Sequence, residues 1–176
     1  MLDLETLGTG AEAAIVSLGA CAFDLETGQI LDTFHQKVMF SPSMGKIDAS
    51  TVLWWFQQSE EARAALLEGE KLPLIDVLRN FRDFATKAQV DGLWSNGPTF
   101  DEVILRAACE RLDVHLGISF RLSRCCRTFF MLAKDLQMPR LAFEGVKHNA
   151  LDDAINQAQA MSAVYRRVTR KEGAEL

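Results

Sequence analysis

The 176-residue sequence lacks several features that mark whole classes of protein. Its four cysteines include no C-x-x-C pair, and no histidine stands at zinc-finger spacing, so we expect no structural zinc site. Cys125 and Cys126 are adjacent, which does not suit a mutual disulfide, and we expect reduced thiols in a cytoplasmic protein. The longest apolar stretch, residues 13–23, contains Ser17 and has no basic flank. It is too short to span a bilayer and does not match a signal peptide, so we expect no membrane partner.

Internal repeats, low-complexity segments and Pro/Gly-rich linkers are also absent from the sequence. Hydrophobic residues make up 48% and charged residues 24%, which is the range of globular proteins and excludes disordered and fibrous classes. A chain of this length buries a core without disulfides or metals. We therefore expect residues 1–176 to form a single domain.

Negative charge exceeds positive charge only modestly, with a net charge of -5. Taken alone, this argues against a protein that coats nucleic acid through bulk electrostatics. The first 100 residues carry 7 basic and 14 acidic side chains, whereas residues 101–176 carry 12 and 10, so the balances are -7 and +2. Six basic residues lie in one stretch: Arg121, Arg124, Arg127, Lys134, Arg140 and Lys147. This stretch is either a phosphate-binding surface or ordinary surface charge.

Short hydrophobic runs and capping residues predict an α/β order of elements. A buried strand is expected at residues 13–23, and Thr27-Gly28 turns the chain into a hairpin with residues 30–39. Further short strands are predicted at residues 93–95 and 124–127. Helices are expected to begin near Asp48, Ser59, Pro73, Thr99, Thr128 and Asn149. Thr99 and Glu102 have the spacing of a capping box.

Three short segments contain most of the candidate chemistry. The first is Asp3-Leu4-Glu5-Thr6, in which a strand would direct the Asp3 and Glu5 carboxylates to the same face. Two carboxylates so close repel each other unless a cation neutralises them, and a divalent cation is the usual partner. The alternative is a polar N-terminal loop, because the D-x-E pattern is common.

The second segment runs from Asn96 through Phe100 to Asp101 and joins a short strand to a helix. Asp101 stands in the first helical turn, where the helix dipole favours a carboxylate. The alternative is plain capping, which Thr99 and Glu102 would explain but which leaves Asp101 free for another role.

The third segment begins at His148 and contains Asn149, Ala150, Asp152 and Asp153. Asn149 suits a helix N-cap, which places His148 just outside the helix and Asp153 one turn into it. An imidazole beside a helical carboxylate suits a general base that activates water. The alternative is a lone histidine before an ordinary capped helix.

In this order and over this length, the three segments resemble the exonuclease motifs of the DnaQ-like DEDDh 3'-5' exonucleases. The D-x-E-T motif matches Asp3, Glu5 and Thr6; the N-x(2–3)-F/Y-D motif matches Asn96, Phe100 and Asp101; the H-x-A-x-x-D motif matches His148, Ala150 and Asp153. The resemblance covers residues 1–168. The Trp54-Trp55 pair and residues 124–128 look most like the branch of phage DexA-type and bacterial exoribonuclease-like enzymes.

The resemblance implies an RNase H-like fold: a five-stranded mixed sheet of order 3-2-1-4-5, with strand 2 antiparallel and helices on both faces. It implies that residues 1–176 are a single exonuclease domain that removes nucleoside monophosphates from the 3' end of single-stranded nucleic acid. In this sequence only Met1 and Leu2 precede Asp3, whereas the first strand of the family usually begins several residues before its aspartate. We expect that so short a strand would fray, loosen Asp3 and Glu5, and weaken metal binding.

The resemblance also implies the roles of the site residues. Four carboxylates would hold two Mg²⁺ or Mn²⁺ ions: Asp3, Glu5, Asp101 and Asp153. His148 would act as the general base. The substrate would be bound by Leu4, Thr6, Asn96 and Phe100, with the free 3'-hydroxyl beside Glu5 and the Leu4 backbone.

Several alternatives stay open at this point. DNA is slightly favoured as the substrate over RNA, because no residue is assigned to a 2'-hydroxyl contact. A non-catalytic nucleic-acid-binding protein on the same fold is a less favoured alternative, because no carboxylate and no histidine of the motifs is missing. Trp54, Trp55 and Phe56 are interpreted as core or interface residues, with base stacking as the alternative, and a homodimer would use them well.

Overall fold

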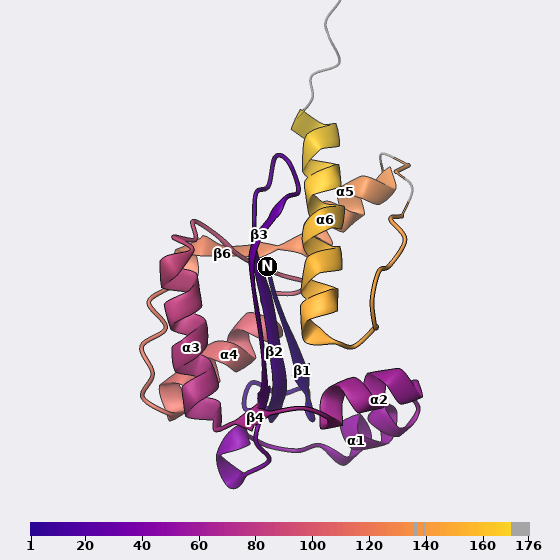
Figure 1. Ribbon diagram of the computed structural model, residues 1–176. Helices are drawn as coiled ribbons and strands as arrows, with labels where there is room; N and C mark the ends of the chain where they lie inside the picture. Colours follow the sequence, from indigo (N-terminus) through magenta and orange to yellow (C-terminus); the bar gives the residue numbers. More distant parts are fainter. Residues whose placement is uncertain (136, 139, 170–176) are drawn as a thin grey trace, which may run out of the picture.

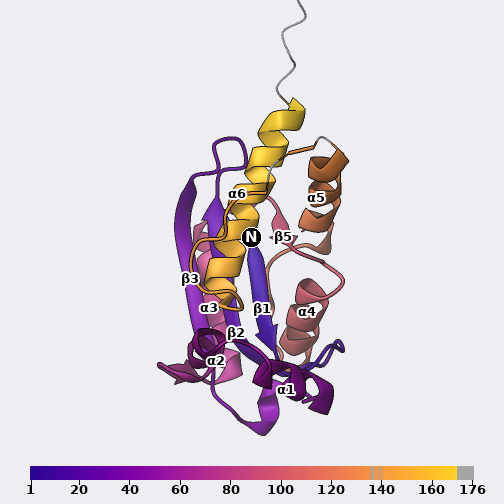
Figure 2. The ribbon, with the colours of Figure 1, turned by 90° about the vertical axis from the view of Figure 1, so that its right-hand side faces the viewer.

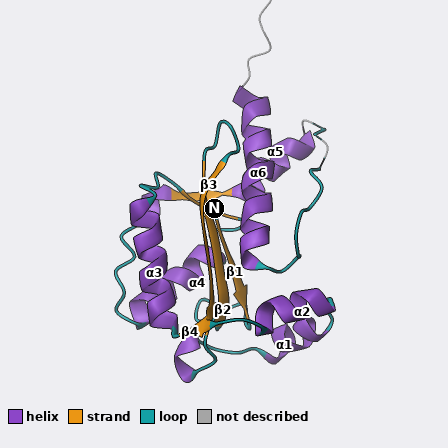
Figure 3. Cartoon of the chain, in the orientation of Figure 1, coloured by secondary structure: helices purple, strands orange, loops and turns teal. Residues whose placement is uncertain are grey.

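The computed structural model describes residues 1–135, 137–138 and 140–169. A central sheet separates two layers of helices (Figures 1 and 3). One layer holds α3 (Leu74–Lys87) and α4 (Asp101–Arg111), and the other holds α5 (Cys126–Asp135) and α6 (Ala150–Thr169). Two short helices, α1 (Ala49–Phe56) and α2 (Glu60–Leu67), lie at one end of the sheet, close to the start of α6 (Figure 2).

The sheet has six strands in the order β4-β3-β2-β1-β5-β6. Their bounds are β1 Leu2–Thr6, β2 Ile15–Phe23, β3 Ile30–Val38, β4 Lys71–Leu72, β5 Leu93–Ser95 and β6 Ser123–Cys125. Strand β2 runs antiparallel to both neighbours, whereas β1, β5 and β6 pair in parallel. Without β4 this is the order that the resemblance implied. The additional strand is β4, a two-residue edge strand that pairs with the end of β3.

Most predicted helix starts are confirmed. The Ser59 hydroxyl accepts a hydrogen bond from the amide of Ala62, and the Asn149 side chain accepts one from the amide of Leu151. Pro73 directly precedes α3. Helix α5 begins at Cys126, two residues before the predicted Thr128.

The capping box predicted for α4 is wrong. The residue before the helix is Phe100, and no side chain caps it. Glu102 is instead buried, and its Oε1 accepts hydrogen bonds from Arg106 and from the Ser123 hydroxyl at the start of β6. A buried carboxylate needs such partners, so Glu102 joins α4 to the sheet edge and does not turn back to the helix N-terminus.

Glycine at position 19 allows α6 to lie directly on the sheet. A Cβ atom on Gly19 would lie 2.1 Å from the backbone carbon of Ala150, which is closer than any real contact. Gly19 is also the β2 partner of Asp3. The first turn of α6 is thereby held against the strand pair that contains the first acidic motif.

Strand β1 is held firmly at its first residues. The amino group of Met1 donates a hydrogen bond of 2.8 Å to the carbonyl of Cys21, and Leu2 is fully buried between β2 and β5. These contacts argue against the fraying that its short length suggested.

The cysteines at 21, 109, 125 and 126 are all free thiols. Among the described residues, no helix is both long and apolar enough to cross a membrane.

Candidate active site

Strand β1 directs two carboxylates toward the first turns of α6. The Asp3 Oδ1 atom accepts a hydrogen bond of 2.8 Å from the Gln157 side chain of α6. Glu5, two residues along, is only 7% exposed. The predicted placement of both side chains on one face of a strand agrees with this arrangement.

The other two carboxylates come from the starts of two helices. Asp101 is the first residue of α4, and its Oδ1 atom accepts a hydrogen bond of 3.2 Å from the amide of Leu4. Asp153 lies in the first turn of α6, and its Oδ2 atom accepts a hydrogen bond of 2.8 Å from the amide of His148. The tertiary structure thus brings three separate sequence segments to one place.

Burial raises the pKa of all four carboxyl groups, and their mutual repulsion adds to this for Asp3 and Glu5. The pKa of Asp3 is raised well above its usual range, first by burial and then by the Asp101 carboxylate. The pKa of Glu5 rises to about 9, again first by burial and then by the Asp3 and Asp153 charges. Burial raises the pKa of Asp101 to about 6 and raises that of Asp153. Such a cluster takes up either protons or cations to lower its repulsion.

His148 lies against this cluster in a constrained position. Its φ angle is +64°, which lies in the left-handed region, and its ring centre is 5.0 Å from that of Trp54 and 6.0 Å from that of Trp55. A second hydrogen bond, from the amide of Val146 to Asp152, ties the preceding loop to α6. The ring is therefore positioned from both sides, by α6 and by α1.

The donor atoms at the centre of the site suit a divalent cation. One donor atom each from Glu5, His148 and Asp153 lie within 4.8 Å of one another. Hard cations such as Mg²⁺ and Mn²⁺ prefer carboxylate oxygens as ligands. Bound cations would also lower the repulsion among the buried carboxylates. The residues present therefore fit divalent ions.

Comparison with known proteins agrees with this geometry. A family model described as "3'-5' exoribonuclease Rv2179c-like domain" matches residues 1–165. The chain belongs to this family. It is a 3'-5' exonuclease that acts on nucleic acid, of the metal-dependent DEDDh superfamily.

Individual proteins that resemble this exonuclease have low sequence identity to it. The chain is 26% identical to the exodeoxyribonuclease of Enterobacteria phage T4, over 94% of this chain and 88% of the phage protein. The nuclease domain of 3'hExo, a DEDDh family member bound to rAMP, superposes with a TM-score of 0.64 at 14% identity, over 94% of this chain and 90% of that one. A full-length 3'-exonuclease superposes with the same TM-score and identity, over 95% of this chain and 60% of that one. These structures share the RNase H-like fold.

The remaining predicted residues of the exonuclease divide between two hollows. Leu4, Thr6 and Phe100 line a cleft of about 400 Å³ beside Glu5, which we call the Glu5 cleft. The Thr6 hydroxyl is already used, because it donates a hydrogen bond of 2.7 Å to the carbonyl of Gly8. Asn96 lies apart from this cleft and lines a groove between α5 and α6.

Three further residues lie at the exonuclease site. Sequence reasoning did not consider Gln157, and it interpreted Trp54 and Trp55 as core or interface residues with base stacking as the alternative. Trp54 lines the Glu5 cleft, and buried Trp55 donates a hydrogen bond of 2.9 Å to the carbonyl of Thr6. Nothing in the sequence relates these tryptophans to the motifs, because only the folded chain brings α1 to the end of β1. Gln157 could have been found, since it stands four residues after Asp153 on the same helical face.

Proposed function

We propose that this exonuclease releases nucleoside monophosphates one at a time from the 3' end of single-stranded nucleic acid, and that Asp3, Glu5, Asp101 and Asp153 hold two Mg²⁺ or Mn²⁺ ions. The observation that carries this proposal is the convergence of four raised-pKa carboxylates with the His148 imidazole. The ions, when bound, would offset the carboxylate charge and stabilise the attacking and leaving oxygens.

The side chains of the protein carry out the remaining steps. A ring nitrogen of His148 takes the proton of the attacking water as the water oxygen forms its bond to phosphorus. The bond between phosphorus and the 3'-oxygen of the penultimate nucleotide breaks, and this oxygen takes a proton from solvent and leaves as a 3'-hydroxyl. Packing against Trp54 and the hydrogen bond from the His148 amide to Asp153 hold the imidazole in place for this transfer. The Glu5 cleft receives the terminal nucleoside, with its free 3'-hydroxyl beside Glu5 and the Leu4 backbone.

DNA is the slightly favoured substrate in this proposal, and RNA is the alternative. The family description names an exoribonuclease, whereas the phage T4 relative is an exodeoxyribonuclease. Phosphate and base recognition do not separate the two, so the outcome depends on contacts near the sugar of the terminal nucleotide.

The test uses 5'-labelled RNA and DNA oligonucleotides of one sequence, with Mg²⁺, with Mn²⁺ or with EDTA. We expect shortening from the 3' end, no reaction in EDTA, and a block by a 3'-phosphate. Asp101→Asn should remove nearly all turnover with the fold kept. Asp76→Asn, which removes an exposed charge on α3, is the matched control. Full activity in EDTA, or early release of the 5' label as a mononucleotide, would contradict the proposal.

We also propose a homodimer, a cytoplasmic location, and one exonuclease domain formed by residues 1–176. Leu53 and Phe56 on α1 are 61% and 70% exposed, and such large apolar side chains favour a contact between copies. The free thiols fit a reducing compartment. Light scattering after size exclusion should give twice the chain mass, and Phe56→Ser should give a monomer; a monomeric parent protein would contradict the homodimer.

A further inference from the structure

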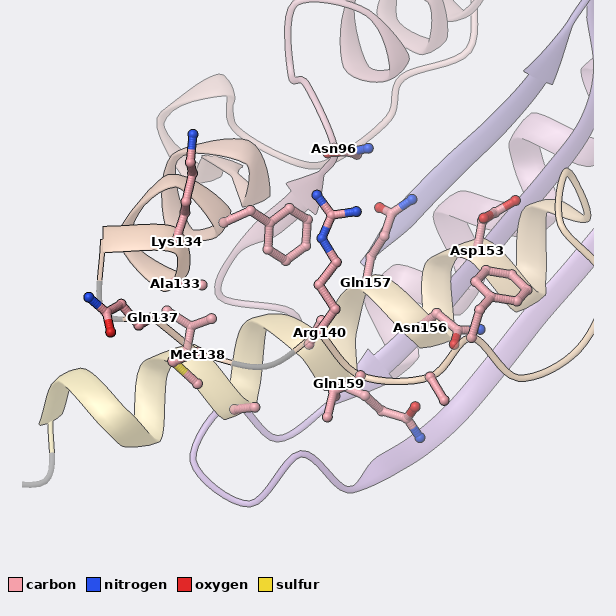
Figure 4. A pocket seen from close by; sticks show the side chains of 17 residues that line it. Asn96, Ala133, Lys134, Gln137, Met138, Arg140, Asp153, Asn156, Gln157 and Gln159 are labelled. Carbon is pink, nitrogen blue, oxygen red and sulfur yellow. The ribbon is translucent and has the colours of Figure 1, made fainter.

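A groove of about 630 Å³ lies between α5 and α6. We call it the α5–α6 groove. It begins at Asp153 and Gln157, and Gln157 is hydrogen-bonded to Asp3. Figure 4 shows Asp153 at one end and Lys134, Gln137 and Met138 at the other. The groove is thus continuous with the carboxylate cluster and leads away from it.

The lining of the groove combines the groups that bind a nucleic acid strand. Phe130 and Phe143 are half-buried and present aromatic surface, on which bases stack. The amide side chains of Asn96 and Gln137 carry both donors and acceptors that suit base edges. The Asn156 amide instead bonds to Glu144 and Asp152 and holds the loop before α6. Among the described lining residues, Asp153 is the one acid. The volume lies within the range of pockets that enclose a small organic ligand.

Two cations in the groove are free to bind anions. Lys134 and Arg140 are exposed, and within the described residues neither forms an ion pair. In Figure 4 the guanidinium group of Arg140 points toward Asn96 and Gln157. A planar guanidinium in this position suits a phosphate group.

The Glu5 cleft differs from the groove in charge. Its described lining contains no lysine and no arginine. A terminal nucleoside has no phosphate beyond the one being attacked, so a cleft without cations fits the end of a strand. A groove with two cations that form no ion pair with any described residue fits the part of the strand that continues with further phosphates.

We propose that the α5–α6 groove binds the nucleotides on the 5' side of the scissile phosphate. Arg140 and Lys134 contact their phosphates, and Phe130 and Phe143 stack on their bases. The proposal rests on the exonuclease function and deepens it: the enzyme requires a single strand that extends beyond the last two nucleotides. A paired strand would carry its partner into α5 and α6.

The experiment compares two kinds of substrate, and so separates this proposal from the proposed function. Oligonucleotides of two to six nucleotides fill the groove to different extents, whereas the p-nitrophenyl ester of thymidine 5'-monophosphate reaches only the Glu5 cleft and the cluster. If the parent enzyme with Mn²⁺ hydrolyses neither substrate, the proposed function fails. If it hydrolyses both, the variants below decide the role of the groove.

We expect Arg140→Ala to lower the ratio of hexanucleotide to ester kcat/KM about 10-fold, the loss typical of one charge-assisted hydrogen bond. Phe143→Ala should have a similar effect, and Phe143→Tyr should restore the ratio. The slope of log kcat/KM against log salt for the hexanucleotide should fall by about 0.7 for each lost phosphate contact. Arg79→Ala on α3, on the opposite face of the sheet, removes the same charge as a control.

Three results would overturn the proposal. The first is an Arg140→Ala enzyme with the parent ratio and the parent salt slope, as expected if the groove holds another protein segment. The second is a parent enzyme whose kcat/KM is the same for two and for six nucleotides. The third is an Arg79→Ala effect as large as that of Arg140→Ala, which would indicate long-range charge and not contact.

Discussion

Removal of divalent metal should make the stability of the protein fall as the pH rises. The pKa of Glu5 is about 9 in the folded protein, against an ordinary value of 4.5 in the unfolded chain. Below about pH 4 both states are protonated and the group has no effect. Between the two values the folded state binds the extra proton, so stability decreases with each unit of pH until the folded pKa is passed.

The magnitude follows from the size of this shift. A difference of one bound proton changes the free energy of unfolding by about 1.4 kcal/mol per pH unit. From about pH 5 to about pH 8, Glu5 alone lowers it by on the order of 3–4 kcal/mol, which corresponds to a fall in Tm of about 10 °C for a domain of this size. Asp101, with a pKa of about 6, adds to the loss at the lower end of this range.

Thermal unfolding, followed by circular dichroism across this pH range, tests the reasoning. In EDTA the Tm should fall with pH, whereas in Mn²⁺ it should fall much less, because the cation replaces the protons. Glu5→Gln, which keeps the shape but cannot ionise, should flatten the EDTA curve. A Tm in EDTA that is constant or rises from about pH 5 to about pH 8 would refute the electrostatic account of the site.

Two further predictions concern the proposed general base and the packing of α6 against Gly19. His148→Ala should lower turnover by about 10²–10⁴-fold with oligonucleotide binding nearly kept. His115 is an exposed histidine, and His115→Ala should have no effect. Near-normal turnover of His148→Ala would make His148 structural. Gly19→Ala should force α6 away from β2, lower stability by about 1–3 kcal/mol and reduce activity. Gly10→Ala is the matched control, because its new Cβ meets nothing within 4 Å, and equal effects of the two on Tm and turnover would contradict the role of Gly19.

The fold could be predicted well because its signals are local or shared with a family. The β2–β3 hairpin follows from the turn at Thr27-Gly28, and the start of α6 follows from Asn149 as N-cap. The two-residue strand β4 escaped notice, because so short an edge strand has no sequence period. The capping box at Thr99 failed because Glu102 found buried partners on β6, a tertiary effect that no local pattern reports.

The candidate site was predictable where its residues belong to short motifs. The positions of Asp3, Glu5, Asp101, Asp153 and His148 agree with one shared centre, although their roles are proposals. The contribution of α1 was not predictable, because the packing of the Trp54 ring on His148 depends on how the chain between β3 and β4 folds back. Likewise, no sequence signal indicated that the Arg140 side chain would point toward Asn96 and Gln157.

The order of the site residues along the chain has a consequence for the cell that makes the protein. Asp3 is synthesised well before His148 and Asp153, and the first turns of α6 reach Asp3 only when α6 settles over Gly19. A chain that has not been translated beyond His148 lacks the proposed base, or has it without the Asp153 carboxylate. The ribosome therefore adds the whole span from β1 through α6 before an active nuclease can form beside its own messenger RNA.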